Sequence, residues 1–378
     1  MRIGIDARFF GPSVGTGIGR YSQRLIEELE LIDRTNEYVV FLRDENIDLY
    51  EPKNPRFSKT LAPWRWYSIS EQRHFPSLVR KTGVHFMHYL HFNVPLFAPR
   101  PFIVTIHDLI LSKYPTVRAS TLEPVRYFLK QLAYRVVIRS AINRAERLLT
   151  VTEHTKNDIV GHFGYPRDRI VVTYEGFDQP NVKPLSGSVL TRYGVTAPFF
   201  LCVGNAYPHK NLERLVDAMI TLRKRGRKEL LVLVGRDDFF YRRLKEYVRS
   251  KQADAYTVFT GYVDDDVLDA FYREARLLVF PSKYEGFGLP GLEAMARGIP
   301  VVAARASCLP EVYGDAAEYF DPDRTDDIAD TVERVVSDGS RIQILRSAGL
   351  QRIKRYSWLR MAEQTLAVYN TVGAKKKR

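Results

Sequence analysis

Two carboxylates flank a glycine-rich turn in the segment YEGFGLPGLEAMARGIPVV, residues 284 to 302. Glu285 precedes the turn and Glu293 follows it, with seven residues between them. The strand-like run RLLVFPS comes before the turn, and Pro290 suits the first position of a helix after it. Because the first N–H groups of a helix have no acceptor inside it, and the helix dipole lies behind them, such a start attracts anions. The segment therefore predicts an anion site between two acids.

A diphosphate suits this helix start because Gly286 and Gly288 let the main chain come close to a phosphate. The expected donors are the backbone N–H groups of Phe287, Gly288 and Leu289. Glu285 can then reach a ring attached to the diphosphate, and Glu293 can accept from the vicinal hydroxyls of a ribose. A simpler interpretation stays open, in which the two acids only complement the helix dipole, worth roughly 0.3–1 kcal/mol each.

Two other segments carry related chemistry. In CVGNAYPHKNLERLV, residues 202 to 216, Lys210 and Asn211 lie between a strand-like run and a helix, where an ammonium group adds a point charge to the backbone donors. The second segment, GPSVGTGIGRY, follows the first strand-like run at residues 11 to 21. In this segment the backbone N–H groups of Thr16, Gly17 and Ile18 are expected to point at the same phosphates. A solvated lysine and an ordinary glycine turn are the alternatives.

These segments need parallel strands to position them, and apolar runs alternate with helical segments along the chain. In the first half the strand-like runs are RIGIDAR, EYVVFL, VHFMHYL, PFIVTIHDLI and RLLTVT. After a stretch rich in proline, glycine and serine at 176–198, the pattern restarts with FFLCVGN, ELLVLVG, YTVFTGYV, RLLVFPS and IPVVAA. Strands this apolar are typical of sheets buried on both faces.

We therefore expect an α/β fold of two Rossmann-like, doubly wound domains that face each other across a cleft. Ligands are expected at the carboxyl ends of the strands. The predicted boundaries are 1–183 for the N-terminal domain, 184–356 for the C-terminal domain, and 357–378 for a final helix that packs back on the first domain and ends in a basic tail.

The composition, with 45% hydrophobic and 27% charged residues among 378, is that of a soluble globular protein. No apolar run reaches about 18 residues, so no membrane-spanning helix is expected. The start MRIGIDARFF does not resemble a secretion signal, and Cys202 and Cys308 lack metal-ligand spacing, which favours reduced core cysteines in a cytoplasmic protein. The net charge of +13 suits phosphorylated ligands or an anionic membrane, whereas no nucleic-acid-binding signature occurs.

Together with VTIHDL at 104 to 109, the three segments resemble the retaining glycosyltransferases of family 4, which have the GT-B fold. The resemblance covers nearly the whole chain and is most specific from 201 to 312. It implies a nucleotide-sugar donor held mainly by the C-terminal domain and a glycan or lipid-linked acceptor held mainly by the N-terminal domain. It also implies that no metal or other cofactor is required.

The resemblance further implies roles for individual residues. Glu285 would lie against the hydroxyls of the donor sugar, and Glu293 would hold the ribose. Lys210 would neutralise the departing diphosphate, and Gly17 would donate its N–H to it. His107 would contact the sugar or place the acceptor, although a histidine that is merely hydrogen-bonded at a strand end is the alternative. The implied donor site also contains Thr16, Gly204, Asn205, Gly261, Tyr262, Val263, Gly286, Phe287, Gly288 and Leu289, with the residues from 261 to 263 bordering the base.

Two positions depart from the family pattern. Many members have an arginine after the glycine that ends the first strand of the C-terminal domain, whereas here Asn205 follows Gly204. A neutral amide cannot supply that charge, so we expect either another cation, such as Arg236, or a heavier dependence on Lys210 and backbone donors. Glu175, in VTYEGFD, stands where an asparagine is common, and the role of that loop stays open.

The expected mechanism follows from where charge develops. Breaking the anomeric C–O bond puts negative charge on the diphosphate, which Lys210 and the helix starts can stabilise without a metal. Since no enzymic nucleophile is evident, we expect the acceptor hydroxyl to attack from the face of the leaving group, with retention of configuration. The segments NAYPHKN and HYLHFNVP look most like bacterial mannosyltransferases of polysaccharide and lipopolysaccharide assembly, which favours GDP-mannose. UDP- and dTDP-sugars stay open as donors.

The acceptor side suggests an interfacial surface. WRWYSISEQRHF, at 64–75, mixes aromatic residues with arginine, and basic helices follow at 126–149. Such surfaces bind anionic lipid, so peripheral attachment to the inner face of the cell membrane is expected. Core aromatics and solvated arginines would explain the same pattern. The sequence does not indicate an oligomeric state.

Three other classes of protein are less consistent with the sequence. A nicotinamide-dependent dehydrogenase needs its glycine motif directly after the strand, but FFGPSV intervenes. A basic, non-enzymatic membrane- or polyanion-binding protein has no need of paired acids beside a phosphate site. A metal-dependent transferase could use the acidic runs GRDDF and VDDDV, but the second run directly precedes a helix, where acids act as caps.

Overall fold

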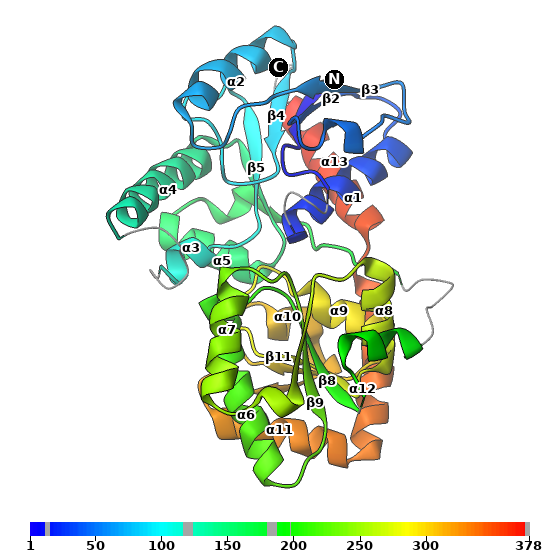
Figure 1. The fold of residues 1–378 in the computed structure, drawn as a ribbon. Helices are drawn as coiled ribbons and strands as arrows, with labels where there is room; N and C mark the ends of the chain where they lie inside the picture. The colour runs from blue at the N-terminus through cyan, green and yellow to red at the C-terminus, as the bar shows by residue number, and fades with distance from the viewer. Residues whose placement is uncertain (12–15, 116–123, 180–186, 197, 375–378) are drawn as a thin grey trace. The chain divides into compact units, whose positions relative to one another are not determined.

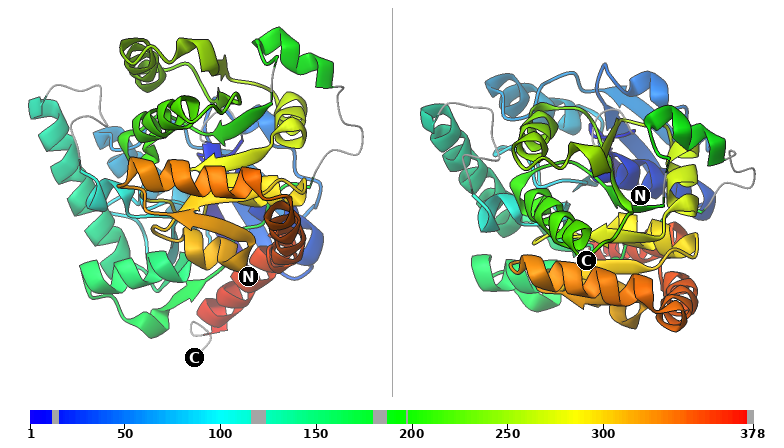
Figure 2. Two further views of the ribbon diagram at one scale, coloured as in Figure 1. Left: turned by 90° about the horizontal axis from the view of Figure 1, so that it is seen from below. Right: turned by 60° about the horizontal axis from the view of Figure 1, so that its bottom comes forward.

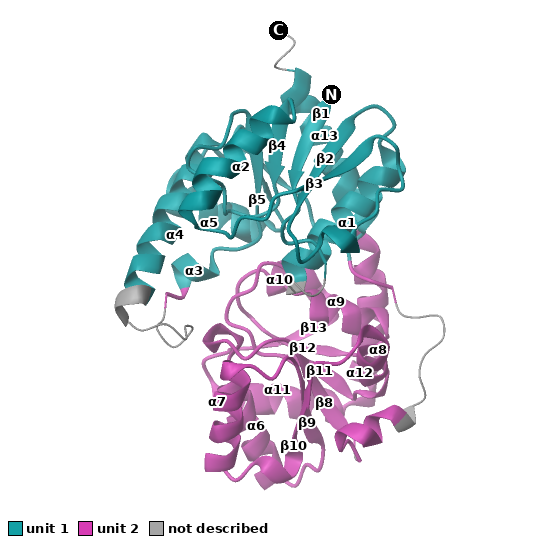
Figure 3. Ribbon diagram, turned by 45° about the horizontal axis from the view of Figure 1, so that its top comes forward, with its two compact units in different colours: residues 1–113, 122–176, 356–378 teal, residues 114–121, 177–355 magenta. Residues whose placement is uncertain are grey.

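The computed structural model describes residues 1–11, 16–115, 124–179, 187–196 and 198–374. The chain forms two compact units (Figures 1 and 3): unit 1 contains residues 1–113, 122–176 and 356–378, and unit 2 contains residues 114–121 and 177–355. The boundary predicted between 183 and 184 lies outside the described residues.

Within the described residues, unit 1 is built on a sheet of seven strands in the order β3-β2-β1-β4-β5-β6-β7, and all its pairings are parallel. The strands are β1 (Arg2–Asp6), β2 (Glu37–Leu42), β3 (Phe57–Leu61), β4 (Phe86–Tyr89), β5 (Phe102–Ile106), β6 (Arg147–Thr150) and β7 (Ile170–Val172). The helices are α1 (Thr16–Ile32), η1 (Ile47–Leu49), α2 (Ile69–Lys81), α3 (Ile110–Lys113), α4 (Pro124–Arg144), α5 (Glu153–Phe163), η3 (Arg167–Arg169) and α13 (Trp358–Ala374).

The core of unit 1 lies between this sheet and the helices that cover it. Strands β4 and β5 are buried along their whole length, as expected for apolar runs covered on both faces. Phe41, Phe75, Phe102 and Ile138 are among the side chains that meet in one buried cluster. The last helix, α13, packs beside α1, and Figure 1 shows the two helices next to each other.

Unit 2 repeats this architecture. Its described residues form a sheet of six strands in the order β10-β9-β8-β11-β12-β13, again all parallel. The strands are β8 (Phe199–Val203), β9 (Leu230–Val234), β10 (Thr257–Gly261), β11 (Leu277–Phe280), β12 (Val301–Ala304) and β13 (Ala317–Phe320).

The longer helices of unit 2 lie on both sides of its strands, with α6 and α7 on one side and α8, α9 and α12 on the other (Figures 1 and 2). The helices are η4 (Gly187–Tyr193), η5 (Pro208–Lys210), α6 (Leu212–Lys224), α7 (Phe239–Ser250), η6 (Asp254–Tyr256), α8 (Asp265–Glu274), α9 (Leu289–Ala296), α10 (Leu309–Tyr313), η7 (Gly314–Ala316), α11 (Thr325–Ser337), α12 (Gly339–Arg352) and η8 (Ile353–Arg355).

The strand orders confirm the predicted fold class of two Rossmann-like, doubly wound α/β units. In unit 1 the order reverses between β1 and β4, and in unit 2 between β8 and β11. Ligands of such sheets bind at the carboxyl ends of the strands where the order reverses. The turn that contains Lys210 follows β8 and the turn that contains Glu285 follows β11, so the fold places both turns at the reversal of unit 2.

Cys202 and Cys308 are both buried and free, in agreement with the prediction of core cysteines. Among the helices in the part of the chain that the structure describes, none is both long and apolar enough to cross a bilayer.

Candidate active site

The turn after β11 leads directly into α9. Gly288 is the N-cap residue of this helix, with φ 94° and ψ 44°, a left-handed conformation that favours glycine. A Cβ atom at Gly288 would lie 2.5 Å from the hydroxyl of Tyr313, which donates to the carbonyl oxygen of Gly288 at 2.6 Å. Leu289 and Pro290 begin the helix, and the glycine cap has no side chain to accept from the first N–H groups. The start of α9 therefore has the backbone geometry of an anion site.

The backbone of Glu285 is held from the other side by Ser307. Ser307 Oγ donates to the carbonyl oxygen of Glu285 at 2.8 Å and accepts from its N–H at 3.2 Å. Ser307 has φ 53°, a conformation uncommon for a residue with a side chain. Nothing in the sequence pattern marks this serine, although it fixes the turn that presents Glu285.

The turn after β8 is tied to the turn after β11. Asn211, with φ 60°, is the N-cap residue of α6, and its Nδ2 donates to the carbonyl oxygens of Pro322 at 2.8 Å and Pro281 at 3.3 Å. The N–H of Lys283 donates to the carbonyl oxygen of His209 at 2.8 Å. These contacts between neighbouring loops hold Lys210, the last residue of η5, beside the turn of Glu285.

Lys210 and Glu285 form an ion pair. Lys210 Nζ donates to Glu285 Oε1 at 2.6 Å, and the two side chains are only 16% and 10% exposed. Lys210 Nζ also lies 5.8 Å from the centroid of the Phe280 ring at the end of β11. Burial and the charge of Lys210 lower the pKa of the neighbouring His209 to about 4, so His209 is neutral at physiological pH. The ion pair therefore carries no net charge as it stands, and the neutral His209 adds none beside it.

Glu293 is held from α8. The hydroxyl of Tyr272 donates to Glu293 Oε2 at 2.8 Å, and burial together with the nearby Glu293 carboxylate raises the pKa of Tyr272 well above its usual value. Arg297 donates to the carbonyl oxygen of Glu293 at 2.9 Å and forms an ion pair with the buried Asp269 at 2.7 Å. The orientation of the Glu293 carboxylate is thus set by a buried tyrosine, which the sequence did not identify.

Glycines link the carboxyl ends of β8, β9 and β10. Gly204 has φ 141° and Gly261 has φ 75°, and the N–H of Gly235 donates to the carbonyl oxygen of Gly261 at 3.3 Å. A Cβ atom at Gly235 would lie 2.1 Å from the carbonyl oxygen of Gly204, which accepts from the hydroxyl of Tyr241 at 2.7 Å. A side chain is therefore excluded by its neighbours at Gly235 only, whereas Gly204 and Gly261 have open space around them and need glycine for their backbone conformation.

The residues around this edge differ in accessibility. Tyr262 is 64% exposed, whereas Val263 is buried. Asn205 Oδ1 accepts from the N–H of Tyr207 at 3.4 Å, so the amide takes part in the turn before η5. Arg236, the cation expected as a substitute at this position, is exposed in the loop after β9. Its role stays a prediction.

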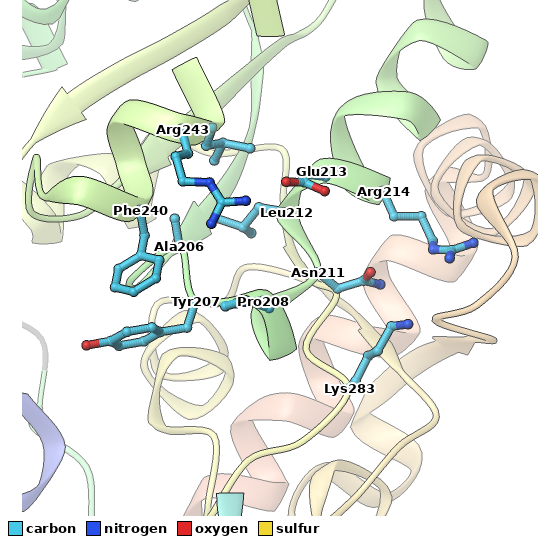
Figure 4. Close-up of a pocket in the computed structure, with 11 residues that line it drawn as sticks. Ala206, Tyr207, Pro208, Asn211, Leu212, Glu213, Arg214, Phe240, Arg243 and Lys283 are labelled. Carbon is cyan, nitrogen blue, oxygen red and sulfur yellow. The ribbon is translucent and has the colours of Figure 1, made fainter. Parts of the chain in front are cut away.

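A pocket of about 230 Å³ opens beside the turn that contains Lys210 (Figure 4). Tyr207 and Phe240, whose ring centroids are 4.5 Å apart, form one wall, and Arg243 points from α7 toward Leu212. The pocket is lined by Ala206, Tyr207, Pro208, Asn211, Leu212, Glu213, Arg214, Phe240, Arg243, Leu244 and Lys283. Sequence reasoning did not find this basic and aromatic pocket, because its cations lie on different elements without a shared motif.

In unit 1, His107 lies at the carboxyl end of β5 and is buried. Its Nδ1 is 3.3 Å from Glu175 Oε1, and its Nε2 donates to the carbonyl oxygen of Leu90 at 2.9 Å. The ring of Tyr21 meets the imidazole edge to face, with centroids 4.7 Å apart. Glu175, whose loop had no assigned role, is therefore a direct partner of His107 and orients its ring.

A buried hydrogen-bonded chain connects this region with α13. Tyr369 and Thr105 contact the two ring nitrogens of His88 at 2.7 and 2.9 Å, and Thr105 Oγ1 is 3.3 Å from the hydroxyl of Tyr21. Burial and then the nearby His107 lower the pKa of His88 to about 3, so its ring is neutral at physiological pH. The last helix is thus connected, through the core of unit 1, to the tyrosine that packs on His107.

The N-terminal glycine segment is described in part, since residues 12–15 lie outside the described ranges. Helix α1 begins at Thr16, and Gly17 is exposed in its first turn. A Cβ atom at Gly17 would meet no other atom within 4 Å, whereas one at Gly19 would lie 2.2 Å from the carbonyl oxygen of Gly11. Close packing therefore requires glycine at position 19, whereas no described atom would meet a side chain at position 17.

The acidic runs considered for a metal site begin helices. Asp238 is the N-cap residue of α7 and accepts from the N–H groups of Phe240 and Tyr241 at 2.9 and 3.0 Å. Asp264 occupies the N-cap position of α8, followed by two acids in the first turn, as predicted for VDDDV. In the residues that the structure describes, no group of three or more His, Cys, Asp or Glu side chains is arranged to hold a metal ion.

The structure thus brings some of the predicted site residues into contact. Lys210 and Glu285 are paired at the start of α9, while the Glu293 side chain contacts α8. Gly204 and Gly261 both contact Gly235. The remaining candidates of unit 1 are His107, Thr16 and Gly17.

Comparison with known proteins gives matches over almost the whole chain. Residues 15–179 match the profile of Glycosyltransferase Family 4, and residues 193–352 match that of Glycosyl transferases group 1. O-antigen chain mannosyltransferase B of Escherichia coli is 30% identical, over 94% of this chain and 96% of its own length. O-antigen chain mannosyltransferase RfbU of Salmonella typhimurium is 24% identical, over 82% of this chain and 84% of its own.

Among solved structures, sucrose-phosphate synthase from Thermosynechococcus elongatus matches with a TM-score of 0.78 and 20% identity, covering 99% of this chain and all of its own. This likeness extends to the fold of both Rossmann-like units. With the profile matches and the relatives of similar length, it leads to one conclusion: the chain is a glycosyltransferase that belongs to family 4 and has the GT-B fold.

Proposed function

We propose that this glycosyltransferase retains anomeric configuration, needs no metal, and moves mannose from GDP-mannose to a hydroxyl of a lipid-linked or polysaccharide acceptor. One observation carries the proposal: Lys210 Nζ lies 2.6 Å from Glu285 Oε1 beside the start of α9. An ammonium group, a carboxylate and a helix start at the carboxyl ends of β8 and β11 suit a diphosphate that carries a sugar.

The ion pair suggests how a donor is distinguished from a bare nucleotide. Lys210 and Glu285 neutralise each other while largely buried, so a diphosphate that binds Lys210 competes with Glu285. A carboxylate that loses its cation in a buried site is destabilised unless other donors reach it. The hydroxyls of a sugar are such donors. A nucleotide-sugar satisfies both partners, and we expect it to bind more tightly than the free nucleoside diphosphate.

The same groups act as the glycosidic bond of the donor breaks. Negative charge develops on the diphosphate, where Lys210 and the first N–H groups of α9 stabilise it. The acceptor oxygen bonds to the anomeric carbon on the face that the diphosphate leaves, and the acceptor proton passes to a phosphate oxygen. Glu285 is a weak nucleophile while it is paired with Lys210, which favours this same-face attack over a covalent intermediate.

Glu293 is proposed to accept from the ribose hydroxyls. Tyr272 donates to Glu293 Oε2 and so fixes the carboxylate at the end of α9 that we propose the ribose meets. The base is proposed to lie along the main chain of Gly261, Tyr262 and Val263. Tyr262 is exposed there, and an aromatic ring at this position can stack on a base.

Mannose is favoured by the relatives, two of which are named as mannosyltransferases of O-antigen chains, and guanine is the base that we propose with it. UDP- and dTDP-sugars are the alternatives, because the choice of base and epimer depends on a few contacts of the ligand. The relatives also favour a lipid-linked or polysaccharide acceptor.

The proposal is tested by incubating the protein with GDP-mannose, UDP-glucose or dTDP-rhamnose, each with octyl α-mannoside as acceptor, in the presence and absence of EDTA. NMR of the product should show mannose transferred in the α configuration of the donor, at the same rate with the chelator. An inverted product or loss of transfer in EDTA would contradict the proposed mechanism. Faster transfer from UDP-glucose or dTDP-rhamnose would contradict the proposed donor only.

A further inference from the structure

The pocket beside the turn of Lys210 lies outside the groups proposed to hold the donor. Its walls come from the segment around η5, from α6 and α7, and from the turn after β11, and its lining does not include Lys210, Glu285 or Glu293, which the structure describes. Helices α6 and α7 cover one side of the strands, whereas α8 and α9, which hold the contact between Tyr272 and Glu293, lie on the other side (Figures 1 and 2). The proposed donor site therefore leaves this pocket without a function.

Two of the cations that line the pocket share one carboxylate. Lys283 Nζ forms an ion pair with Asp323 Oδ1, and Arg214 Nη2 lies 4.0 Å from the same oxygen. The side chains of Lys283 and Arg214 are 25% and 33% exposed, while that of Asp323 is 67% exposed. Two cations from separate elements thus converge on a position that an anionic oxygen already occupies.

The carboxylate of Asp323 can be exchanged at this position. An ion pair whose partner is so exposed contributes little to stability, because water screens the charges. A phosphate monoester has a charge of about −1.5 to −2 near pH 7 and three acceptor oxygens, so it can bind Lys283 and Arg214 together where the carboxylate supplies a single charge. Helix α6 begins beside them at Leu212, and the positive end of its dipole adds to the attraction.

The other lining residues suit a sugar ring. Tyr207 and Phe240, whose ring centroids are 4.5 Å apart, give the pocket an aromatic wall on which the apolar C–H face of a pyranose can pack. Figure 4 shows this wall on one side of the pocket and the two cations on the other. Glu213 and Arg243 also line the pocket and offer an acceptor and donors for hydroxyl groups. A volume of about 230 Å³ is smaller than that of pockets for drug-sized ligands and suits a monosaccharide.

We propose that this pocket is a second ligand site, which binds a monosaccharide phosphate with its phosphate on Lys283 and Arg214 and its ring against Tyr207 and Phe240. The expected ligand is a free phosphate monoester. Each phosphate of a lipid-linked or polymeric glycan is a diester with one negative charge, which matches two converging cations less well. The inference does not depend on the donor or on the stereochemistry of transfer, because the pocket shares no lining residue with the proposed donor contacts at Lys210, Glu285 and Glu293.

The test is isothermal titration calorimetry of the full chain with mannose 6-phosphate at about pH 8, where the monoester is a dianion. The titration is carried out without nucleotide and again in excess GDP, and we expect one bound molecule with the same Kd in both. Mannose lacks the phosphate, and mannose 6-(methyl phosphate) is a monoanionic diester. Both should bind at least about 10-fold more weakly, since hydrogen bonds to charged groups contribute at least that factor.

Three variants in the pocket should change the affinity in opposite directions. Lys283→Gln and Arg214→Gln each remove a cation and should weaken the binding of mannose 6-phosphate by about 10-fold or more. Asp323→Asn removes the competing carboxylate and should strengthen binding by about 2–5-fold. If the ion pair only stabilised the loops, breaking it from either side would have the same effect, so the opposite signs distinguish a ligand site from a structural contact.

Two matched controls remove cations with similar surroundings elsewhere. The Lys59 side chain is 29% exposed and is paired with the exposed Glu51 of unit 1, and the Arg225 side chain is 35% exposed and is paired with Asp330 in unit 2. Neither cation lines the pocket. Lys59→Gln and Arg225→Gln should therefore bind mannose 6-phosphate within about twofold of the wild type. Circular dichroism of every variant verifies that it is folded.

Four results would overturn the proposal. They are no heat of binding at millimolar mannose 6-phosphate, an affinity for the methyl diester or for inorganic phosphate equal to that for mannose 6-phosphate, weaker binding by Asp323→Asn, and competition by GDP, which would place the sugar phosphate in the donor site. If GDP itself does not bind, the titration without nucleotide still tests the pocket, so the proposed donor and the proposed second site fail separately.

Discussion

Replacing Lys210 by methionine separates the catalytic role of the ammonium group from the packing of the side chain. Methionine keeps most of the length of lysine and can still lie against the Phe280 ring, which is 5.8 Å from Lys210 Nζ. The substitution removes one positive charge beside the start of α9 and leaves Glu285 without its partner at 2.6 Å. Both consequences can be estimated and measured separately.

The losses of activity and of stability come from different effects. Removing one preorganised donor to a developing charge reduces kcat by about 10²–10³-fold, equivalent to about 2.7–4 kcal/mol. The Glu285 side chain is 10% exposed, and removing one partner of a buried ion pair costs about 3–5 kcal/mol of folding free energy. Since domains unfold at about 5–15 kcal/mol, a domain of average stability remains folded at 25 °C after this loss.

The double variant Lys210→Met/Glu285→Gln distinguishes the two effects. Replacing both partners of a buried pair is often nearly neutral for folding, so the double variant should recover most of the lost stability without recovering activity. Initial rates of GDP release in the presence of acceptor and unfolding in urea are the measurements. The matched control is Lys245→Met, whose partner Asp237 is 49% exposed, and it should change neither quantity by much.

One combination of results would refute this reasoning. If Lys210→Met is less stable than the wild type, the ion pair was present and has been broken. If the same variant nevertheless turns over GDP-mannose at the wild-type rate, Lys210 does not stabilise the leaving group. The start of α9 would then have to act alone, and the proposed mechanism would lose its only side-chain cation.

Three further predictions concern other residues. Glu293→Gln should weaken GDP binding by about 1–3 kcal/mol but leave the binding of 2′,3′-dideoxy-GDP unchanged. Calorimetry with both nucleotides measures this, and an equal loss of binding free energy for the two would exclude a contact between Glu293 and the ribose hydroxyls. Glu175→Ala should lower kcat at least about 10-fold, because the ring of His107 loses the carboxylate that orients it. Glu175→Gln keeps an acceptor for His107 and should retain most of the wild-type rate. If neither variant changes the kinetics, Glu175 does not position His107. Burial alone would raise the pKa of Asp33, but hydrogen bonds, led by that from Tyr38, lower it to about 2. The ionised Asp33 should therefore add about 2 kcal/mol to the free energy of unfolding above pH 4, and this contribution should disappear as the pH falls toward 2. Unfolding in urea should show that Asp33→Asn has a smaller free energy of unfolding than the wild type at pH 6. This difference should disappear toward pH 2, and a difference that does not change with pH would contradict the role of the Asp33 carboxylate.

The buried strands could be predicted from the sequence, whereas the edge strands β3, β7 and β13 could not; the edge strand β10 lies within the predicted run YTVFTGYV. Strands such as β8 and β11 are apolar along nearly their whole length because both faces are covered. By contrast, β3, β7 and β13 lie at edges of the two sheets and are only partly buried. Their mixed composition gives no clear period of two, and their place in the sheet depends on pairing with a neighbour far away in the chain.

The local geometry of the candidate site could be predicted where neighbouring residues in the sequence determine it. A glycine turn before a helix defined the region around Glu285, and a lysine at a helix start defined Lys210. Tertiary contacts decided the rest, because no local pattern shows that Tyr272 holds Glu293 or that Ser307 holds the backbone of Glu285.

The N-terminal glycine triplet shows the same limit. The role of Gly17 as a donor to the diphosphate stays a prediction, while the packing role of Gly19, where a Cβ atom would lie 2.2 Å from the carbonyl oxygen of Gly11, is visible only in the structure. Only the approach of the chain at residue 11 to α1 makes that distinction. Similarly, the partnership of Glu175 with His107 joins residues 68 positions apart.

A crystal structure of the protein with GDP-mannose, grown without divalent metals, tests the central claim most directly. We predict diphosphate oxygens within hydrogen-bonding distance of Lys210 Nζ and of the N–H groups at the start of α9. Glu285 should then have exchanged Lys210 for hydroxyls of the mannose. A bound donor that leaves the 2.6 Å contact between Lys210 and Glu285 intact, with its phosphates elsewhere, would contradict the account.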